Sequence, residues 1–132
     1  MENKNKVFKY WLDGSKNSLE LAGFIYKKGY YDHALFCAHL SIEKLLKAKI
    51  VEKTNNFAPH SHDLLYLAGL AGIDINEKQQ QFLVEVNAFN IEGRYPEERL
   101  EFSRKISKGS AEKYIKKIGE FYKWLLQQKE KS

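Results

Sequence analysis

The stretch ALFCAHLSIEKLLKAKIVEKT, residues 34–54, carries small and apolar residues along two adjacent helical stripes. The first stripe comprises Ala34, Cys37, Ala38, Ser41, Leu45 and Ala48, and the second comprises Leu35, Ile42, Leu46 and Lys49. Residues three and four apart lie on the same side of a helix, so the two stripes form an apolar arc wider than one partner helix covers. We therefore expect a helix from Tyr30 to about Thr54 at the centre of a bundle, with neighbours on two sides.

Four further segments have the apolar periodicity of helices. They run from Val7 to about Lys28, from the cap Ser61 to Gly72, from the cap Asn76 to about Ile91, and from about Lys108 to Gln128. Gly29 is a stop signal after the first segment, and Pro59 breaks the chain before the second. Because no alternating strand pattern competes with these segments, we expect an all-α fold. The expected architecture is an antiparallel up-and-down bundle of four main helices plus one short helix, in a single domain spanning residues 1–132.

The connection from Glu92 to Ser107 differs from the others, because about sixteen residues separate two predicted helices. Loops of this length are uncommon in a compact domain unless they serve a function. Within the connection, Arg94 and Tyr95 precede Pro96, whose ring restricts the backbone. We predict a long loop that presents Arg94 and Tyr95 beside the bundle and that Pro96 stiffens.

Composition excludes several classes of protein. Of the 132 residues, 43% are hydrophobic and 14% aromatic, which is too rich in apolar side chains for a disordered chain. Charged residues make up 30%, and no run approaches the roughly 20 apolar residues that a membrane span needs. The N-terminal run MENKNKVFKYW contains no apolar stretch of signal-peptide length. We expect a soluble cytoplasmic protein that does not associate with membranes.

An excess of basic residues points to anionic partners. Twenty-two Lys and Arg against 17 Asp and Glu give a net charge of +5. Three basic clusters are Lys44, Lys47, Lys49 and Lys53; Arg104, Lys105 and Lys108; and Lys113, Lys116 and Lys117. Basic surfaces attract phosphate through the release of counterions, so a nucleotide or a nucleic acid is a natural partner. The alternative is that these lysines cover the wet faces of helices and serve only solubility.

Two histidines are candidates for acid–base chemistry. His39 lies beside the apolar stripe of the central helix, where it is either a hydrogen-bonded core residue or a catalytic one. His62 follows Ser61 in the run HSHD and either anchors the start of a helix or acts as a base. Helical metal sites commonly use ligands at positions i and i+4, a spacing that the histidines lack, and Cys37 is the only cysteine. We therefore expect neither a metal nor another cofactor.

Polar residues at the end of the 76–91 segment form a candidate ligand-binding site. Asn87 and Asn90 are about one helical turn apart, and Arg94 and Tyr95 follow the predicted helix end. A guanidinium matches phosphate with parallel hydrogen bonds, and a tyrosine ring can stack on a base. This pattern favours binding of a nucleotide or of RNA phosphate.

Glu43 and Lys47 extend this candidate site. They are spaced as an i, i+4 ion pair on the central helix. If that helix is enclosed, Glu43 is partly buried and can hold Arg94 by charge-assisted hydrogen bonds. The alternative to phosphate binding is therefore that Arg94 clamps the long connection to Glu43.

Four motifs together resemble the HEPN family of small prokaryotic helical proteins. They occur in order across nearly the whole chain and are ALFCAHLSIEKLLKAKIVEKT, PHSHDLLYLAGLAGI, NAFNIEGRYPEE and the run from Tyr122 to Leu125. The resemblance implies a helical bundle that usually forms a homodimer, often with a minimal nucleotidyltransferase in a toxin–antitoxin arrangement. The positions that match the family pattern are His39, Glu43, Lys44, Lys47, His62, Asn87, Asn90, Arg94, Tyr95 and Pro96.

The resemblance also bears on catalysis. Several HEPN branches are metal-independent ribonucleases, which carry an Arg followed after a few residues by a His and pool these pairs in the dimer cleft. Arg94 stands at the place of that Arg, but no His follows it in this chain. We therefore expect a binding module. The alternatives are an endoribonuclease in which His39 or His62 is the base, and a scaffold whose aromatic side chains, such as Tyr30, Tyr31 and Trp124, serve only dimer and partner contacts.

Overall fold

The computed structural model describes residues 3–129, and within this range it holds six helices and no strand. The helices are α1 (Lys4–Lys27), α2 (Tyr31–Thr54), α3 (Leu64–Leu70), α4 (Glu77–Asn87), α5 (Pro96–Lys105) and α6 (Lys108–Gln127). This confirms the all-α fold class predicted from the sequence. None of these helices is long and apolar enough to cross a membrane.

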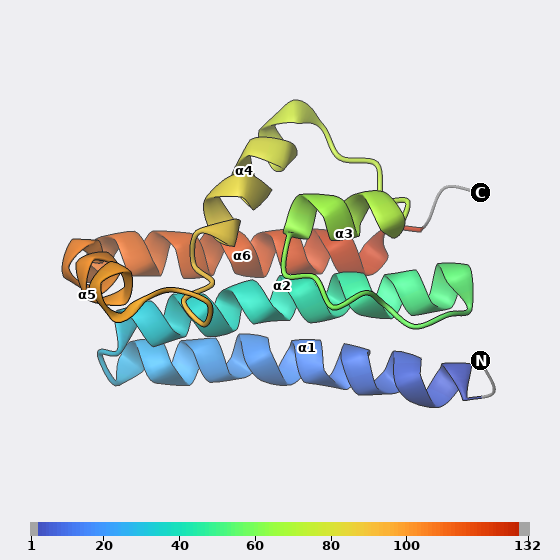
Figure 1. The fold of residues 1–132 in the computed structure, drawn as a ribbon, viewed down its shortest axis with the longest axis horizontal. Coiled ribbons are helices and arrows are strands. Elements are labelled where there is room, and N and C mark those ends of the chain that lie inside the picture. Colours follow the sequence, from blue (N-terminus) through green and yellow to red (C-terminus); the bar gives the residue numbers. More distant parts are fainter. Residues whose placement is uncertain (1–2, 130–132) are drawn as a thin grey trace.

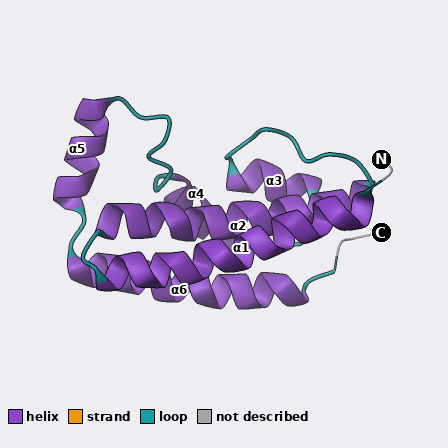
Figure 2. Cartoon of the chain, turned by 90° about the horizontal axis from the view of Figure 1, so that it is seen from below, coloured by secondary structure: helices purple, strands orange, loops and turns teal. Residues whose placement is uncertain are grey.

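Three long helices form the body of the bundle. α1 and α2 pack along their lengths as an antiparallel hairpin, and α6 lies along α2 and runs in the same direction as α2 (Figure 1). The turn between α1 and α2 passes through Gly29, whose φ of 89° suits a residue without a Cβ. α3 packs on α2 and contacts α4, while α5 stands across one end of the bundle (Figure 2). The connection from α2 to α3 runs back along α2 and brings its residues over that helix.

α2 supplies the centre of the core, in agreement with its two apolar stripes. Leu35, Ile42 and Leu46 are buried almost completely. Full burial of such a side chain contributes roughly 1.5–3 kcal/mol of transfer free energy. Because neighbours cover α2 on several sides, burial extends to some of its polar residues, which are His39, Ser41, Glu43 and Lys47. These polar groups need partners inside the protein, since an unpaired buried polar group is costly.

Side-chain caps define the starts of two helices near the candidate site. Asn76 caps α4 as predicted, and Gln79 completes a capping box by accepting a hydrogen bond from the Asn76 N–H at 2.9 Å. The prediction that Ser61 caps the next helix is wrong, because Asp63 is the cap of α3 and accepts from the Leu65 N–H at 3.1 Å. Ser61 instead accepts a hydrogen bond from the Asp63 N–H at 3.1 Å and orders the turn before the helix.

The predicted long loop from Glu92 to Ser107 is wrong, because most of it forms α5. Pro96 occupies the start of this helix, where its missing N–H costs no hydrogen bond. Acidic residues in the first turn and basic residues in the last turn complement the helix dipole. α5 buries none of its residues completely, so it lacks the apolar stripe by which a helix is recognised in a sequence. α4 also ends earlier than predicted, at Asn87 instead of near Ile91.

Candidate functional site

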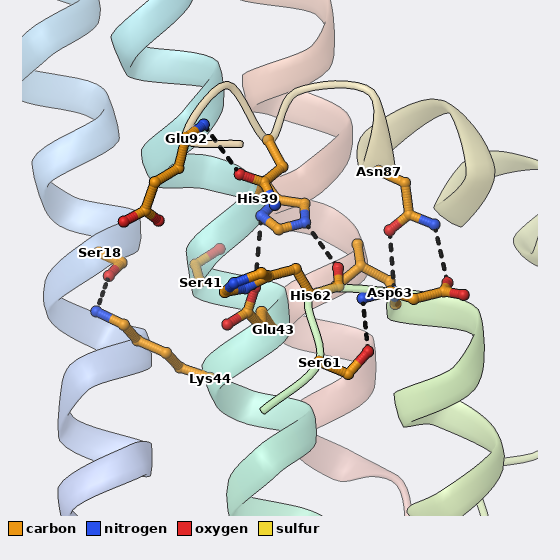
Figure 3. A network of polar contacts seen from close by, with 12 residues as sticks. Ser18, His39, Ser41, Glu43, Lys44, Ser61, His62, Asp63, Asn87 and Glu92 are labelled. Atoms are coloured by element: carbon orange, nitrogen blue, oxygen red, sulfur yellow. Dashed lines mark hydrogen bonds and ion pairs between the residues drawn. The ribbon is translucent and has the colours of Figure 1, made fainter. Parts of the chain in front are cut away.

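A buried carboxylate, that of Glu43, is the centre of a polar network on α2 (Figure 3). Glu43 is 4% exposed, and its two oxygens have separate partners. Oε1 accepts a hydrogen bond from Nδ1 of His62 at 2.9 Å, and Oε2 accepts one from Nζ of Lys47 at 3.1 Å. Hydrogen bonds that involve charged groups are stronger than neutral ones, so they offset part of the cost of burying the carboxylate.

Lys47 is enclosed together with Glu43. It is 5% exposed, and its Nζ lies 5.2 Å from the centroid of the Trp11 ring on α1, within the range of a cation–π interaction. This lysine neutralises Glu43 inside the protein and has little surface left for a ligand. The neighbouring Lys44 is also engaged, because its Nζ donates to the hydroxyl of Ser18 on α1 at 2.9 Å.

His39 lies beside the Glu43–His62 pair and is fully buried on α2. Its Nε2 is 3.3 Å from the backbone carbonyl of His62, so Nε2 carries the hydrogen and donates it. Nδ1 lies 3.8 Å from Oε1 of Glu43 and has no hydrogen-bond partner among the described residues. Burial lowers the pKa of His39, although the charge of Glu43 opposes this effect, so the ring is neutral near pH 7. With no exposed surface, His39 can support the connection that carries His62 but cannot itself meet a ligand.

His62 is the surface member of this network. It lies in the connection before α3, and about half of its side chain is exposed. Because Nδ1 donates to Glu43, the lone pair of the neutral ring is on Nε2. A carboxylate on one imidazole nitrogen fixes the tautomer and the orientation of the ring, which is the support that a general base requires. His62 can therefore accept a proton at the surface or, once protonated, bind an anion there.

Arg94 lies in the turn between α4 and α5 and is partly exposed. Its Nη2 donates to the backbone carbonyl of Ala88, just past the end of α4, and its Cζ lies 5.0 Å from the centroid of the Phe102 ring. Across residues 3–129 it forms no ion pair with Glu43, whose partners are histidine and lysine. The clamp between Arg94 and Glu43 that the sequence left open is therefore not formed. Tyr95, at the cap position of α5, is 74% exposed.

The two asparagines serve different local structures. Asn87 accepts a hydrogen bond from the Leu64 N–H at 2.9 Å and donates to Oδ1 of Asp63 at 3.0 Å, so it fastens α4 to the start of α3. Asn90 accepts from the Glu92 N–H at 3.2 Å within the turn that follows α4. The spacing of the two asparagines predicts one helical face, but α4 ends at Asn87 and Asn90 lies beyond it. In the described part of the chain, the side chains of these asparagines form no hydrogen bond with Arg94 or Tyr95.

The pairing of Glu43 with His62 is the feature that sequence reasoning missed. Both residues are candidates from the sequence on separate grounds, but no periodicity relates a helix position to a residue in a connection 19 positions later. The contact of Lys47 with Trp11 was missed for the same reason. Within residues 3–129, no three His, Cys, Asp or Glu side chains are grouped so that they could hold a metal ion.

Comparisons with known proteins bear on the family and the fold. A family model described as HEPN domain matches residues 8–130. The crystal structure of TT1696 from Thermus thermophilus is similar, with a TM-score of 0.75 and 19% sequence identity over 91% of this chain and 96% of that chain. At this identity the likeness shows a shared fold. A search of curated proteins gave no match.

Proposed function

Because the chain belongs to the HEPN domain family, we propose that it is a nucleotide- or RNA-phosphate-binding module that acts as a homodimer with a nucleotidyltransferase partner in a toxin–antitoxin-like system. The observation that carries the proposal is the position of Arg94. Its guanidinium is partly exposed. It does not pair with the buried carboxylate of Glu43, because Glu43 is paired with Lys47 and His62. Arg94 therefore keeps hydrogen-bond donors for phosphate.

The surroundings of Arg94 suit an anionic ligand that also carries a nucleobase. A guanidinium has five N–H donors, of which Nη2 uses one on the carbonyl of Ala88, and the Phe102 ring holds the group in place. Tyr95 is adjacent and exposed, so its ring can stack on a nucleobase. The net charge of +5 favours the approach of a polyanion.

The homodimer and the nucleotidyltransferase partner rest on the family and on exposed apolar side chains. Leu21, Phe24, Val84 and Leu100 are each about half exposed, which leaves apolar surface that a partner can cover. Sedimentation of the purified protein is expected to give twice the mass of one chain.

Binding is tested by incubating the purified protein with labelled RNA and with ATP, and by measuring both retention and cleavage. We expect the wild type to retain at least one of the two probes without cleaving RNA. Arg94→Ala should abolish retention, and Tyr95→Ala should weaken it while leaving the fold intact, because the Tyr95 side chain is exposed. Tyr66→Ala, at an exposed tyrosine on α3, is the matched control. Unchanged retention in both the Arg94 and the Tyr95 variant would refute this site.

A second candidate function is that of a metal-independent endoribonuclease, and the orientation of His62 favours it. In this reaction, Nε2 of His62 takes the proton of a ribose 2′-hydroxyl, whose oxygen attacks the adjacent phosphorus, and the 5′-oxygen leaves with a proton from water. The mechanism requires that the guanidinium of Arg94 reach the same phosphate and stabilise the charge of the phosphorane. Loss of a general base typically costs about a hundredfold or more in rate, so His62→Gln should lower cleavage by that factor. Cleavage that survives both His62→Gln and Arg94→Ala rules out this mechanism.

A further inference from the structure

A pocket outside the network of Glu43 lies between the first half of α1 and the connection from α2 to α3. Its volume is about 410 Å³. Three aromatic residues, Tyr10, Trp11 and Phe57, line it together with the basic residue Lys6 and with His60. We call it the aromatic pocket. Its volume is in the range of roughly 300–1,000 Å³ that is typical of sites for small ligands.

Two of the three aromatic side chains of this pocket are mostly exposed, and that of Trp11 is partly exposed. Phe57 is 70% exposed, and Tyr10 is more than half exposed. The rings of Tyr10 and Trp11 have centroids 5.2 Å apart and are tilted by 36°. Large apolar side chains that gather in water at one place usually mark a binding site, and aromatic faces favour another flat ring.

The charge of the pocket selects an anion. Lys6 and His60 line it, and none of the acidic side chains within residues 3–129 does. The ammonium of Lys6 attracts a phosphate, and the imidazole of His60 can donate a hydrogen bond to one. Aromatic side chains that stack on bases, combined with basic groups that attract phosphate, are the two elements by which proteins bind single-stranded nucleic acid without sequence preference.

One wall of the pocket is already held in place. Nζ of Lys47, buried and bonded to Glu43, lies 5.2 Å from the centroid of the Trp11 ring. A ring that is fixed before binding loses little conformational entropy when a ligand arrives. The same lysine connects the aromatic pocket with the carboxylate that orients His62.

We propose that the aromatic pocket is a second ligand site, which takes the base of a nucleotide against Tyr10, Trp11 and Phe57 and its phosphate beside Lys6 and His60. The inference rests on the proposed function, because it takes the ligand to be a nucleotide. It places recognition of the base in the aromatic pocket and not at Arg94. The base belongs either to a free nucleotide or to a single-stranded RNA. A protein partner does not fit as well, because stable protein interfaces cover roughly 800 Å² on each side, whereas a pocket of this size holds one ring system and its phosphate.

The test uses the fluorescence of Trp11 in a Trp124→Phe background, with AMP, ribose 5-phosphate and a six-nucleotide RNA as probes. Stacking of a base on Trp11 should quench its fluorescence. We expect quenching by AMP or by the RNA, and at least about fivefold weaker response to ribose 5-phosphate, which has no base. Equal responses to AMP and ribose 5-phosphate, together with no effect of the RNA, would overturn the proposal. Quenching by the RNA alone identifies a strand as the source of the base, and quenching by AMP identifies a free nucleotide.

Phe57→Ala is the decisive variant, and Tyr66→Ala is its control. Both side chains are more than half exposed, at 70% and 51%, so neither truncation should unfold the protein, but Tyr66 does not line the pocket. Phe57→Ala should weaken binding of the probe about fivefold or more, and Tyr66→Ala should leave it unchanged. If Phe57→Ala lowers the mass in sedimentation and leaves binding unchanged, the pocket is a surface for self-association and the proposal is wrong.

The same variants separate this inference from the proposed function. Loss of RNA retention in Tyr95→Ala and Arg94→Ala, with no change in Phe57→Ala, supports the Arg94 site and overturns the aromatic pocket. Loss in Phe57→Ala alone supports the aromatic pocket and overturns the Arg94 site. A wild type that binds none of the probes contradicts both.

Discussion

Glu43 on α2 and His62 in the connection to α3 are joined by a hydrogen bond of 2.9 Å between Oε1 and Nδ1. The other carboxylate oxygen binds Lys47, so one buried side chain holds a surface histidine and a buried cation at the same time. The connection that carries His62 is therefore fastened to the core by a charged group, and the position of His62 depends on that group.

We expect Glu43→Ala to lower the free energy of unfolding strongly. Lys47 is 5% exposed, and removal of its partner leaves an uncompensated buried charge, for which losses of about 3–5 kcal/mol are typical. Urea unfolding measures this change. The control is Glu101→Ala, which breaks the exposed pair of Glu101 with Lys105 on α5 and should cost less than about 1 kcal/mol. Similar losses in the two variants would show that burial does not set the cost.

Stability should depend on pH through His39. Its pKa is lowered in the folded protein, so below the ordinary histidine pKa of about 6.5 the unfolded chain binds more protons than the folded one. Stability therefore falls as the pH drops through 6.5, and this loss ends below the lowered folded-state pKa. For a single group the slope is at most about 1.4 kcal/mol per pH unit.

Urea unfolding at pH 7.5 and pH 5.5 tests the role of His39. His39→Gln keeps a donor for the His62 carbonyl but does not titrate, so its stability should fall less between the two pH values than that of the wild type. His33→Gln, at a histidine whose side chain is 55% exposed, is the comparison variant. The role assigned to His39 fails if the Gln variant keeps the full pH dependence.

Asn87 should be a stability residue, because both ends of its amide are occupied between α4 and α3. Asn87→Ala leaves the Leu64 N–H without its acceptor, which typically costs about 1–3 kcal/mol. Asn87→Asp should cost more, since it places a carboxylate against Asp63. Asn90→Ala, which affects only an exposed turn, is the milder comparison. Thermal or urea unfolding ranks the three variants, and an Asn87→Ala protein as stable as the wild type contradicts the bridging role.

Arg94 and Tyr95 should differ in stability although they are adjacent. Arg94→Ala removes the hydrogen bond to the Ala88 carbonyl and the contact with Phe102, so we expect a loss of about 1–2 kcal/mol. Tyr95→Ala should change the free energy of unfolding by less than about 0.5 kcal/mol, because its side chain is mostly in water. Equal losses in urea unfolding would mean that Tyr95 has a structural contact that its exposure does not indicate.

The amino-acid sequence by itself determined the helical class and the central place of α2. Apolar residues at helical spacing have to be buried together, and the two stripes of residues 34–54 require neighbours on more than one side. The same periodicity predicted α1, α3, α4 and α6, and Asn76 marked the start of α4. α5 escaped prediction because an exposed helix buries no complete stripe, so its residues resemble a polar loop.

Tertiary structure alone decided which candidate residues meet. Glu43, His62, Lys47 and Trp11 come together from two helices and a connection, whereas Asn87 and Asn90 separate because α4 ends between them. The physical reason is that helix periodicity is a local property of the sequence. Helix periodicity indicates which residues share a face within one element. A contact between elements depends on where helices end, on how they pack and on the path of each connection.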